Sequence, residues 1–390
     1  MSARPEIRGS VGAGFEAVHR AFEENFLRRN ELGAAFCLFH RGSKVVDLWG
    51  GIRNAATGEP WQKDTMVLVF SATKGLAAMA MALAHSRGWL DFEERVCTYW
   101  PEFAQGGKDK ITVRQLLAHQ AGLFAFPGMA DRNLISDPGR LAAVLAKQEP
   151  AWAPGERQGY HALSLGYYQS ELLRRIDPKH RSLGQFFQDE IASPLGLDVY
   201  IRLPEAIPNT RLAVVERPRF WAWLTEMPLP LTLVAINPRS NLSRALAGAD
   251  LYYDDKRIYA RDFEVPSGGG VGTARAIAHA YGVFASGGHE LGLRPETLAA
   301  LEAPAVPPRR GFRDACLLGK VQFSLGFMKP SAVWPMGSAA AFGAPGAGGS
   351  LGFADPANEI GYAYVTNRMS MKVTGDPREV ALRNAVFSSL

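Results

Sequence analysis

The chain opens with an apolar pattern of helical period and continues with two short apolar runs. Between residues 12 and 30 the apolar positions recur every three to four residues, at Phe15, Val18, Phe22 and Phe26. This period predicts an amphipathic helix. Residues 34–40 and 44–49 are largely apolar and are joined by an Arg-Gly-Ser turn, which is typical of a β-hairpin. An antiparallel sheet is therefore expected to begin near the N-terminus.

A second pattern begins at Ser71, where the chain becomes strongly helix-forming. From this serine to His85 most residues are Ala, Leu or Met, and they are apolar on every face past the first turn. A helix that is hydrophobic all round is a buried one. Further helical segments, separated by Pro and Gly turns, are predicted at residues 113–119, 140–146, 164–176 and 183–192. The middle of the chain is therefore expected to be mainly helical.

Strand-like runs return late in the chain. They cover residues 321–328, 349–354 and 360–367, and a closing helix begins at about Arg378. The predicted fold class is α+β: an antiparallel sheet flanked by helices and built from both chain ends, with a mainly helical region inserted. We expect a sheet domain made of residues 1–70 and 265–390, a helical domain made of residues 71–264, and an active site at their interface.

Composition and charge narrow the classes of function. Of the 390 residues, 47% are hydrophobic and 21% are charged, which is typical of a globular protein. The net charge of +5 is small for this length and no block of five basic residues occurs, so we expect no nucleic-acid partner. The three cysteines are an odd number without a Cys-x-x-Cys pair, and the isolated His119, His161 and His289 lack metal-ligand spacing. We expect no metal and no organic cofactor.

No segment predicts membrane insertion. The N-terminus lacks the continuous apolar stretch of a secretory signal, and no run approaches the roughly 18 uninterrupted apolar residues of a spanning helix. We therefore expect a cytoplasmic protein without a membrane span. Residues 221–236 come closest, but one Glu and two Pro interrupt them; they form either a wall or flap over a pocket or part of the ordinary core. Whether the protein forms a homo-oligomer is left open by the sequence.

Ser71 and Lys74 are the first residues with an evident chemical use. They lie three apart at the start of the predicted helix, so their side chains share a face, and they form the only Ser-x-x-Lys of the sequence. A serine hydroxyl becomes a nucleophile when a neighbouring base takes its proton, and burial lowers the pKa of a lysine towards neutrality. The helix N-terminus also favours negative charge beside the serine. A serine that merely caps the helix would leave the buried lysine unexplained.

Several motifs together resemble the serine β-lactamase and penicillin-binding-protein superfamily. They are SATK at residues 71–74, ITVRQLLAHQAGL at 111–123, WAPG at 152–155 followed by YHA at 160–162, PLGL at 194–197 and FGAPGAGG at 342–349. The resemblance covers most of the chain from about residue 30 to the end and is nearest to the family VIII carboxylesterases. It implies a β-lactamase/transpeptidase-like fold and a serine esterase.

The resemblance also implies roles for individual residues. Tyr160 matches the tyrosine of the family's second motif and is expected to act as general base for Ser71. It would be a phenolate supported by the positive charge of Lys74. The backbone N–H groups of Ser71 and Ala347 would form the oxyanion hole. Apart from the resemblance, we expect the substrate pocket to be lined by Phe124, Phe126, Trp334, Gly346 and Gly348; for the three aromatic residues the alternative is the ordinary core. His161, beside Tyr160, is expected to support the tyrosine.

The sequence departs from the penicillin-directed members of this superfamily at two places. Ala162 stands where those proteins usually carry the Asn of Tyr-x-Asn, and Ala344-Pro345-Gly346 stands in place of a Lys-Thr-Gly-like triplet. Loss of the cation weakens recognition of anionic β-lactams. The expected substrate is therefore a small neutral ester, hydrolysed through an acyl-enzyme on Ser71. A short acyl chain is expected because nothing in the sequence indicates a long lipid tunnel.

Three other functions stay open. A β-lactamase or D-aminoacyl peptidase, and an acyltransferase that passes the acyl group to an acceptor other than water, would use the same motifs. A catalytically inactive binding protein is compatible with the loss of the cation at Ala344.

A competing motif lies at residues 348–352. Its sequence, Gly-Gly-Ser-Leu-Gly, matches the nucleophile elbow of α/β-hydrolases. That fold needs a catalytic histidine after the serine, whereas the last histidine of this chain is His289. Ser350 is therefore predicted to be a strand residue beside the active site.

Overall fold

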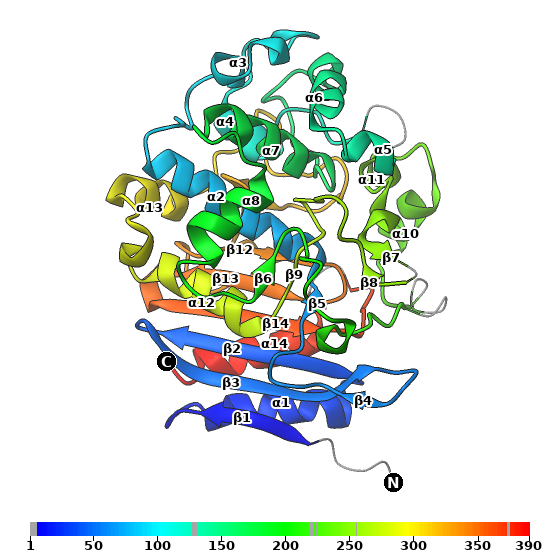
Figure 1. The fold of residues 1–390 in the computed structure, drawn as a ribbon, viewed down its shortest axis with the longest axis vertical. Coiled ribbons are helices and arrows are strands. Elements are labelled where there is room, and N and C mark those ends of the chain that lie inside the picture. Colours follow the sequence, from blue (N-terminus) through cyan, green and yellow to red (C-terminus); the bar gives the residue numbers. More distant parts are fainter. Residues whose placement is uncertain (1–5, 127–130, 219–221, 223–224, 255, 373–374) are drawn as a thin grey trace.

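The computed structural model describes residues 6–126, 131–218, 222, 225–254, 256–372 and 375–390. Its main strands are β1 (Ile7–Val11), β2 (Gly33–His40), β3 (Ser43–Asn54), β4 (Glu59–Pro60), β10 (Gln322–Ser324), β11 (Phe327–Lys329), β12 (Phe342–Pro345), β13 (Leu351–Asp355) and β14 (Ile360–Thr366). Within the described residues these strands form one antiparallel sheet in the order β1-β3-β2-β14-β13-β12-β11-β10, with β4 paired to β3. The sheet therefore joins the two chain ends (Figure 1).

Helices cover both faces of this sheet. On one face lie α1 (Glu16–Arg28) and α14 (Pro377–Phe387), and on the other lie α12 (Ala274–Ala285) and the buried α2 (Thr73–Ser86). Side chains of β14 alternate between the two cores, as the period of a strand requires. Tyr362 and Tyr364 pack with α1 and α14, whereas Ala363 and Val365 pack with α2 and α12.

The middle of the chain forms a mainly helical region above the sheet in Figure 1. Its helices are α3 (Val96–Tyr99), α4 (Val113–Leu117), α5 (Arg132–Ile135), α6 (Pro138–Lys147), α7 (Ser164–Ile176), α8 (Leu183–Phe187), α10 (Leu229–Ile236) and α11 (Asn241–Ala245), and α13 (Pro295–Glu302) follows α12. Capping boxes begin α4 and α8, where Thr112 and Ser182 accept the N–H of a glutamine three residues later. Each cap fixes the residue at which its helix begins.

Short elements connect the larger ones. A small sheet pairs β5 (Val67–Leu68) and β6 (Val199–Tyr200) with β9 (Val271–Gly272), and β7 (Tyr253–Asp254) pairs with β8 (Ile258–Tyr259). Single helical turns are η1 (Phe70–Ala72), η2 (Pro101–Ala104), η3 (Gln188–Ala192), η4 (Asn209–Arg211), η5 (Ala249–Tyr252), η6 (His289–Leu291) and η7 (Pro356–Asn358). The small sheet matters for the site, because β5 leads directly into η1.

The predicted fold class is confirmed, and three local predictions change. Residues 321–328 form the hairpin β10–β11 instead of one strand, because Leu325 and Gly326 both take positive φ angles, of 51° and 89°, as a tight two-residue turn requires. Residues 183–192 divide into α8 and the π-helical turn η3. Ser71 lies in η1, just before α2. The division at residues 70 and 265 stays a prediction.

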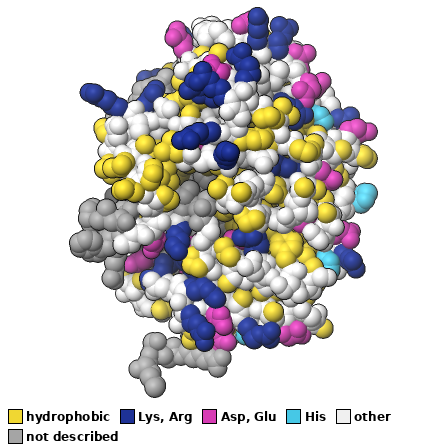
Figure 2. Space-filling view, turned by 180° about the vertical axis from the view of Figure 1, so that it is seen from behind, with side chains coloured by type: hydrophobic (Ala, Val, Ile, Leu, Met, Phe, Trp, Pro, Cys, Tyr) yellow, Lys and Arg dark blue, Asp and Glu magenta, His cyan; other side chains and the backbone are white. Residues whose placement is uncertain are grey.

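The apolar stretch at residues 221–236 lies partly on the surface. Trp221 lies outside the described residues. In α10 the side chains of Leu229, Leu233 and Ile236 are exposed, whereas Leu231 is buried, so this part of the stretch is a surface helix. No described helix has the length and apolarity to cross a membrane. On the face in Figure 2, basic side chains are spread among acidic, apolar and uncharged ones.

Candidate active site

Ser71 lies at a sharp entry into α2. Phe70, directly before it, takes a left-handed φ of 48°, which is rare for a residue other than glycine and marks local strain. Thr73 stabilises this turn: its hydroxyl donates to the carbonyl of Phe70 at 2.5 Å and accepts the N–H of Gly270 at 2.8 Å. The half-buried Ser71 is thus presented at the N-terminal end of a buried helix.

Lys74 is buried one turn further along, with 3% of its surface exposed. Its Nζ lies 3.3 Å from the Oγ of Ser71, 2.6 Å from the carbonyl oxygen of Ala162 and 2.8 Å from that of Ser267. Burial lowers the pKa of this amine to about 7. None of the ion pairs among the described residues includes it, so no carboxylate restores the charge.

Tyr160 completes the group. Its side chain hydrogen-bonds that of Ser71, and the Nζ of Lys74 lies 4.8 Å from the centre of its ring. The backbone N–H of Tyr160 donates to Asp314 at 3.3 Å, and its ring stacks on Phe323. Burial raises the pKa of the phenol. These surroundings favour a protonated phenol. Neither the raised pKa of Tyr160 nor the lowered pKa of Lys74 supports the phenolate that the sequence led us to expect.

His119 and His161 support the tyrosine loop from behind. The N–H of His161 donates to Nδ1 of His119 at 3.0 Å, and Nε2 of His161 accepts the N–H of Leu123 at 3.0 Å. Nδ1 of His161 lies 2.7 Å from the carbonyl oxygen of Gly159, so the ring is a neutral Nδ1–H tautomer. Burial lowers the pKa of His161 to about 3. These contacts hold His161 in place beside Tyr160, and its supporting role stays a prediction. His289 lies exposed in η6.

The end of β12 lies against η1. A Cβ added to Gly346 would lie 2.1 Å from the carbonyl oxygen of Val69, so only glycine permits this approach. Ala347 directly follows Gly346 and is exposed; Ser71, two residues after Val69, is half-buried. In the described turns and loops, no backbone hydrogen bond has the N–H of Ser71 or Ala347 as donor. An oxyanion hole needs two backbone N–H groups that are available to donate, and these two lie where the end of β12 meets η1.

Comparison with known proteins decides the family. The model of the beta-lactamase family matches residues 18–385. The chain belongs to the beta-lactamase family. It is 32% identical over 369 residues to the esterase/beta-lactamase LipL of Mycobacterium tuberculosis (strain ATCC 25618 / H37Rv), covering 93% of this chain and 83% of LipL. The predicted superfamily and the predicted class, a serine hydrolase, are confirmed.

Two solved structures extend the comparison. A family VIII carboxylesterase superposes with a TM-score of 0.86 at 34% identity, covering 99% of this chain and all of that one. A penicillin-binding-protein homologue from Caulobacter crescentus superposes with a TM-score of 0.85 at 35% identity, again over 99% and 100% of the two chains. Both cover essentially the whole of this member of the beta-lactamase family, which confirms the predicted fold.

Only part of the predicted substrate pocket comes together near Tyr160. Phe124 shares an apolar cluster with Tyr160 and stacks on Trp152 at 5.2 Å. Phe126 belongs to the main core instead, and its ring contacts Tyr167. Gly348 is buried, and its carbonyl oxygen accepts a hydrogen bond from Arg378. The pocket-facing role of Phe126 therefore gains no support.

Trp334 and Gly346 line a small void of about 10 Å³ together with Ser350. Ser350 is 2% exposed and directly precedes β13, a strand rather than the helix that a nucleophile elbow needs. A larger cavity of about 270 Å³ lies between α6, α7 and residues 262–266, and its lining includes none of Ser71, Lys74 and Tyr160.

Ala344 marks the departure from the penicillin-directed members of the family. Its side chain is 4% exposed and faces α2, where a Cβ added to Gly75 would lie 3.2 Å from it. Such close packing leaves no room for a longer side chain in the same direction. Position 344 therefore presents no cation, and the described residues include no group of three metal-binding side chains.

Sequence reasoning missed three parts of the site. The carbonyl groups of Ala162 and Ser267 hold Lys74, but a backbone acceptor has no side-chain signature. Ser267 begins the run Ser-Gly-Gly-Gly, and this run was a usable signal for close backbone approach. Tyr252 contacts Phe70 edge-on at 6.0 Å, and its pKa is raised mainly by burial and also by its proximity to Tyr160.

Proposed function

We propose that this protein is a serine carboxylesterase that hydrolyses simple, short-acyl esters through an acyl-enzyme on Ser71. The observation that carries the proposal is the contact of Ser71 with a buried lysine whose pKa is lowered to about 7. The names of its relatives agree, since LipL is an esterase/beta-lactamase and one solved neighbour is a family VIII carboxylesterase.

The hydrogen bonds of Lys74 support a neutral amine as the base. The carbonyl oxygens of Ala162 and Ser267 can only accept, so each requires an N–H from Nζ. A neutral amine has two N–H groups and one lone pair. With both N–H groups engaged, the lone pair is left for the third neighbour, the hydroxyl of Ser71. Lys74 is thus arranged to accept the proton of the nucleophile.

Acylation then proceeds by one attack and one departure. Ser71 Oγ forms a bond to the carbonyl carbon of the ester while its proton passes to Lys74. The negative charge on the carbonyl oxygen is stabilised by the N–H groups of Ser71 and Ala347. When the C–O bond breaks, the leaving alkoxide takes a proton. Water repeats the sequence on the acyl-enzyme, with Lys74 again accepting the first proton.

We assign the leaving-group proton to Tyr160. A phenol with a raised pKa stays protonated, touches Ser71 and can donate to an alkoxide. Lys74, once charged, returns its proton to the phenol to restore the site. This assignment reverses the role expected for Tyr160, because burial acts in opposite senses on the two groups: it favours the neutral amine and also the neutral phenol.

A β-lactamase activity is the second candidate, because LipL carries both names. The buried Ala344 argues against it, since position 344 offers no cation for a β-lactam carboxylate. Hydrolysis rates of a chromogenic cephalosporin and of p-nitrophenyl acetate, measured with the same preparation, separate the two. The proposal expects the ester to be cleaved with the larger kcat/KM.

The central test is the intact mass of the protein after incubation with a serine-reactive phosphonate. The parent and Ser350→Ala should each gain one phosphonyl group, and Ser71→Ala should gain none. Labelling lost only in Ser350→Ala would overturn the proposal. No labelling of the parent would favour the binding-protein alternative, and added acceptor alcohols, with product analysis, would reveal an acyltransferase.

A further inference from the structure

We propose that Arg378 is a positioning residue for the oxyanion loop, residues 346–349, and that it acts through the carbonyl group of Gly348. The inference rests on the proposed function, because it concerns the N–H of Ala347 in that same site. Arg378 lies in the first turn of α14, only 3% exposed, and the sequence gives it no role beyond opening the closing helix.

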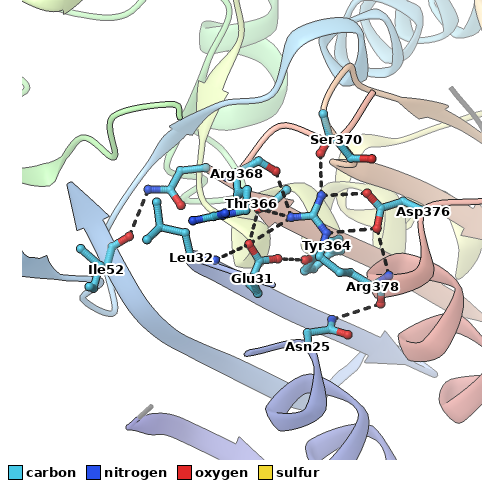
Figure 3. Close-up of polar contacts among 12 residues, drawn as sticks. Asn25, Glu31, Leu32, Ile52, Tyr364, Thr366, Arg368, Ser370, Asp376 and Arg378 are labelled. Carbon is cyan, nitrogen blue, oxygen red and sulfur yellow. Dashed lines mark hydrogen bonds and ion pairs between the residues drawn. The ribbon is translucent and has the colours of Figure 1, made fainter. Parts of the chain in front are cut away.

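Arg378 is the centre of a buried ionic network (Figure 3). It pairs with Asp376 through two hydrogen bonds, from Nε at 3.0 Å and from Nη2 at 2.7 Å, and its Nη1 lies 3.1 Å from Glu31. Glu31 in turn accepts the hydroxyls of Tyr364 and Thr366. A buried charge held by this many partners has one orientation, because leaving any partner unpaired is costly.

This fixed guanidinium reaches the oxyanion loop. Nη2 donates to the carbonyl oxygen of Gly348 at 3.0 Å, and the same oxygen accepts the N–H of Ser370 at 3.2 Å. A Cβ added to Gly349 would lie 2.9 Å from Asp376 and 3.1 Å from Arg378, and Gly349 takes a φ of 113°. The glycine therefore lets the ion pair approach the loop backbone.

The contact matters because it anchors one side of Ala347. On the other side, the N–H of Gly346 donates to the carbonyl of Ser350 at 2.7 Å. Between these anchors the exposed Ala347 is followed by two glycines, whose backbone rotates with little steric resistance. With both peptide groups held, the N–H of Ala347 keeps one direction. Without Arg378, Ser370 alone would hold the carbonyl of Gly348. The peptide group that carries the N–H of Ala347 would then keep only the 3.3 Å bond that the carbonyl of Gly346 accepts from the N–H of Gly349, inside the loop itself, and its direction would be less firmly held.

The same helix offers a matched control. Arg383 is also buried, at 8% exposure, and pairs with Glu379 of α14 through Nε at 2.8 Å. Its guanidinium also donates to the carbonyl of Pro335, and no hydrogen bond joins it to residues 346–349 within the described structure. Removing either arginine breaks a buried ion pair, but only Arg378 touches the oxyanion loop.

The experiment compares Arg378→Lys, Arg378→Met and Arg383→Met with the parent. Arg378→Lys keeps the charge but has no fork that reaches Asp376 and Gly348 together. Steady-state kinetics with p-nitrophenyl acetate, affinity for a boronic acid that mimics the tetrahedral intermediate, thermal stability, and amide hydrogen exchange of a peptide covering residues 342–350 are measured on all four proteins.

We expect both Arg378 variants to lose about 10- to 100-fold in kcat, with KM nearly unchanged, since a misplaced oxyanion donor acts on the transition state. Boronic-acid affinity should fall by a similar factor and loop exchange should accelerate. Arg383→Met should lose stability but keep kcat. Full activity in Arg378→Lys, or equal losses in Arg378→Met and Arg383→Met, would overturn the inference.

Two outcomes keep the inference separate from the proposed function. A parent that neither hydrolyses esters nor reacts with the phosphonate contradicts the proposed function, while loop exchange still tests the anchor. An active parent whose loop exchange is unchanged in Arg378→Lys contradicts the anchor alone. If Arg378→Met does not fold, Arg378→Lys, judged by the same kinetics and exchange, decides the matter.

Discussion

The lysine that contacts Ser71 and two other lysines of the chain are buried in almost the same way, yet their surroundings differ. Lys74, Lys108 and Lys329 are each at most 3% exposed, and each holds backbone carbonyl groups. Lys108 donates to three of them, and so does Lys329, whose partners belong to Leu301, Glu302 and Ala340. Lys74 donates to two and meets a hydroxyl as its third neighbour.

The third neighbour explains the difference. Three carbonyl acceptors require three N–H groups, which only the ammonium form provides. Nearby carboxylates add to this, since Glu149 raises the pKa of Lys108 and Glu302 raises that of Lys329, although burial still lowers both to about 8. Lys74 has neither a third carbonyl nor such a carboxylate, and its pKa falls to about 7. A buried lysine can therefore act as a base where only two carbonyl groups require an N–H from its Nζ, because its neutral form satisfies both of them.

The strongest test of this difference is to replace each lysine by methionine, which removes its amine. Lys74→Met should lower kcat for p-nitrophenyl acetate by about 10³-fold, the size of a general-base contribution, because the phenol of Tyr160, which also contacts Ser71, has a raised pKa and stays protonated. Lys329→Met should keep kcat within a factor of about two. Retention of more than a tenth of the parent kcat in Lys74→Met would contradict the assignment of the base.

Tyr160→Phe tests the second half of the proton path. It should lower kcat by about 10²-fold for an ethyl ester, whose alkoxide needs a proton to leave. The loss should be much smaller for a p-nitrophenyl ester, because nitrophenolate leaves without one. Equal losses for the two esters, followed spectrophotometrically and by released acid, would instead favour Tyr160 as the base.

The pH dependence of kcat/KM and of stability tests the role of Lys74 as a base. Its neutral form predominates above the pKa of about 7, so kcat/KM should rise about tenfold per pH unit below 7 and level off above it. Folding has the same sign. The folded pKa lies below the ordinary value of 10.5, so the unfolded chain binds more protons between these values and stability rises with pH there. Urea unfolding of Lys74→Met should show no such rise of stability with pH. A kcat/KM of the parent that does not change with pH would contradict the role of neutral Lys74 as the base.

The smallest effect on activity is expected at the structural lysine, where stability responds instead. Lys329→Met leaves three carbonyl groups without their donor, which should lower the free energy of unfolding by about 2–4 kcal/mol. Urea unfolding measures the loss. The surface control is Lys372→Met, because Lys372 is exposed and its backbone N–H donates to the hydroxyl of Ser370. Equal stability of the two variants would show that the carbonyl contacts of Lys329 contribute little.

The sequence predicts local parts of this protein well. The helix and hairpin of the N-terminal third, the buried helix after Ser71 and the late strands follow from apolar periodicity. The Ser71–Lys74 contact follows from a spacing of three within one turn. The hairpin at Leu325 and the place of Phe126 do not follow, because a positive φ at a leucine and the choice between pocket and core both depend on neighbours distant in the chain.

What the sequence determined by itself is therefore the α+β fold class and the pairing of Ser71 with a neighbouring amine, since the helical and strand periods and the spacing of these two residues are local features of the chain. Tertiary structure decided what these groups can do. The two carbonyl groups that hold Lys74 come from positions 88 and 193 residues away. Arg378, which donates from α14 to the oxyanion loop, reaches Glu31 across 347 residues. Protonation and donor direction depend on burial and on backbone acceptors, and neither has a side-chain identity that a sequence displays.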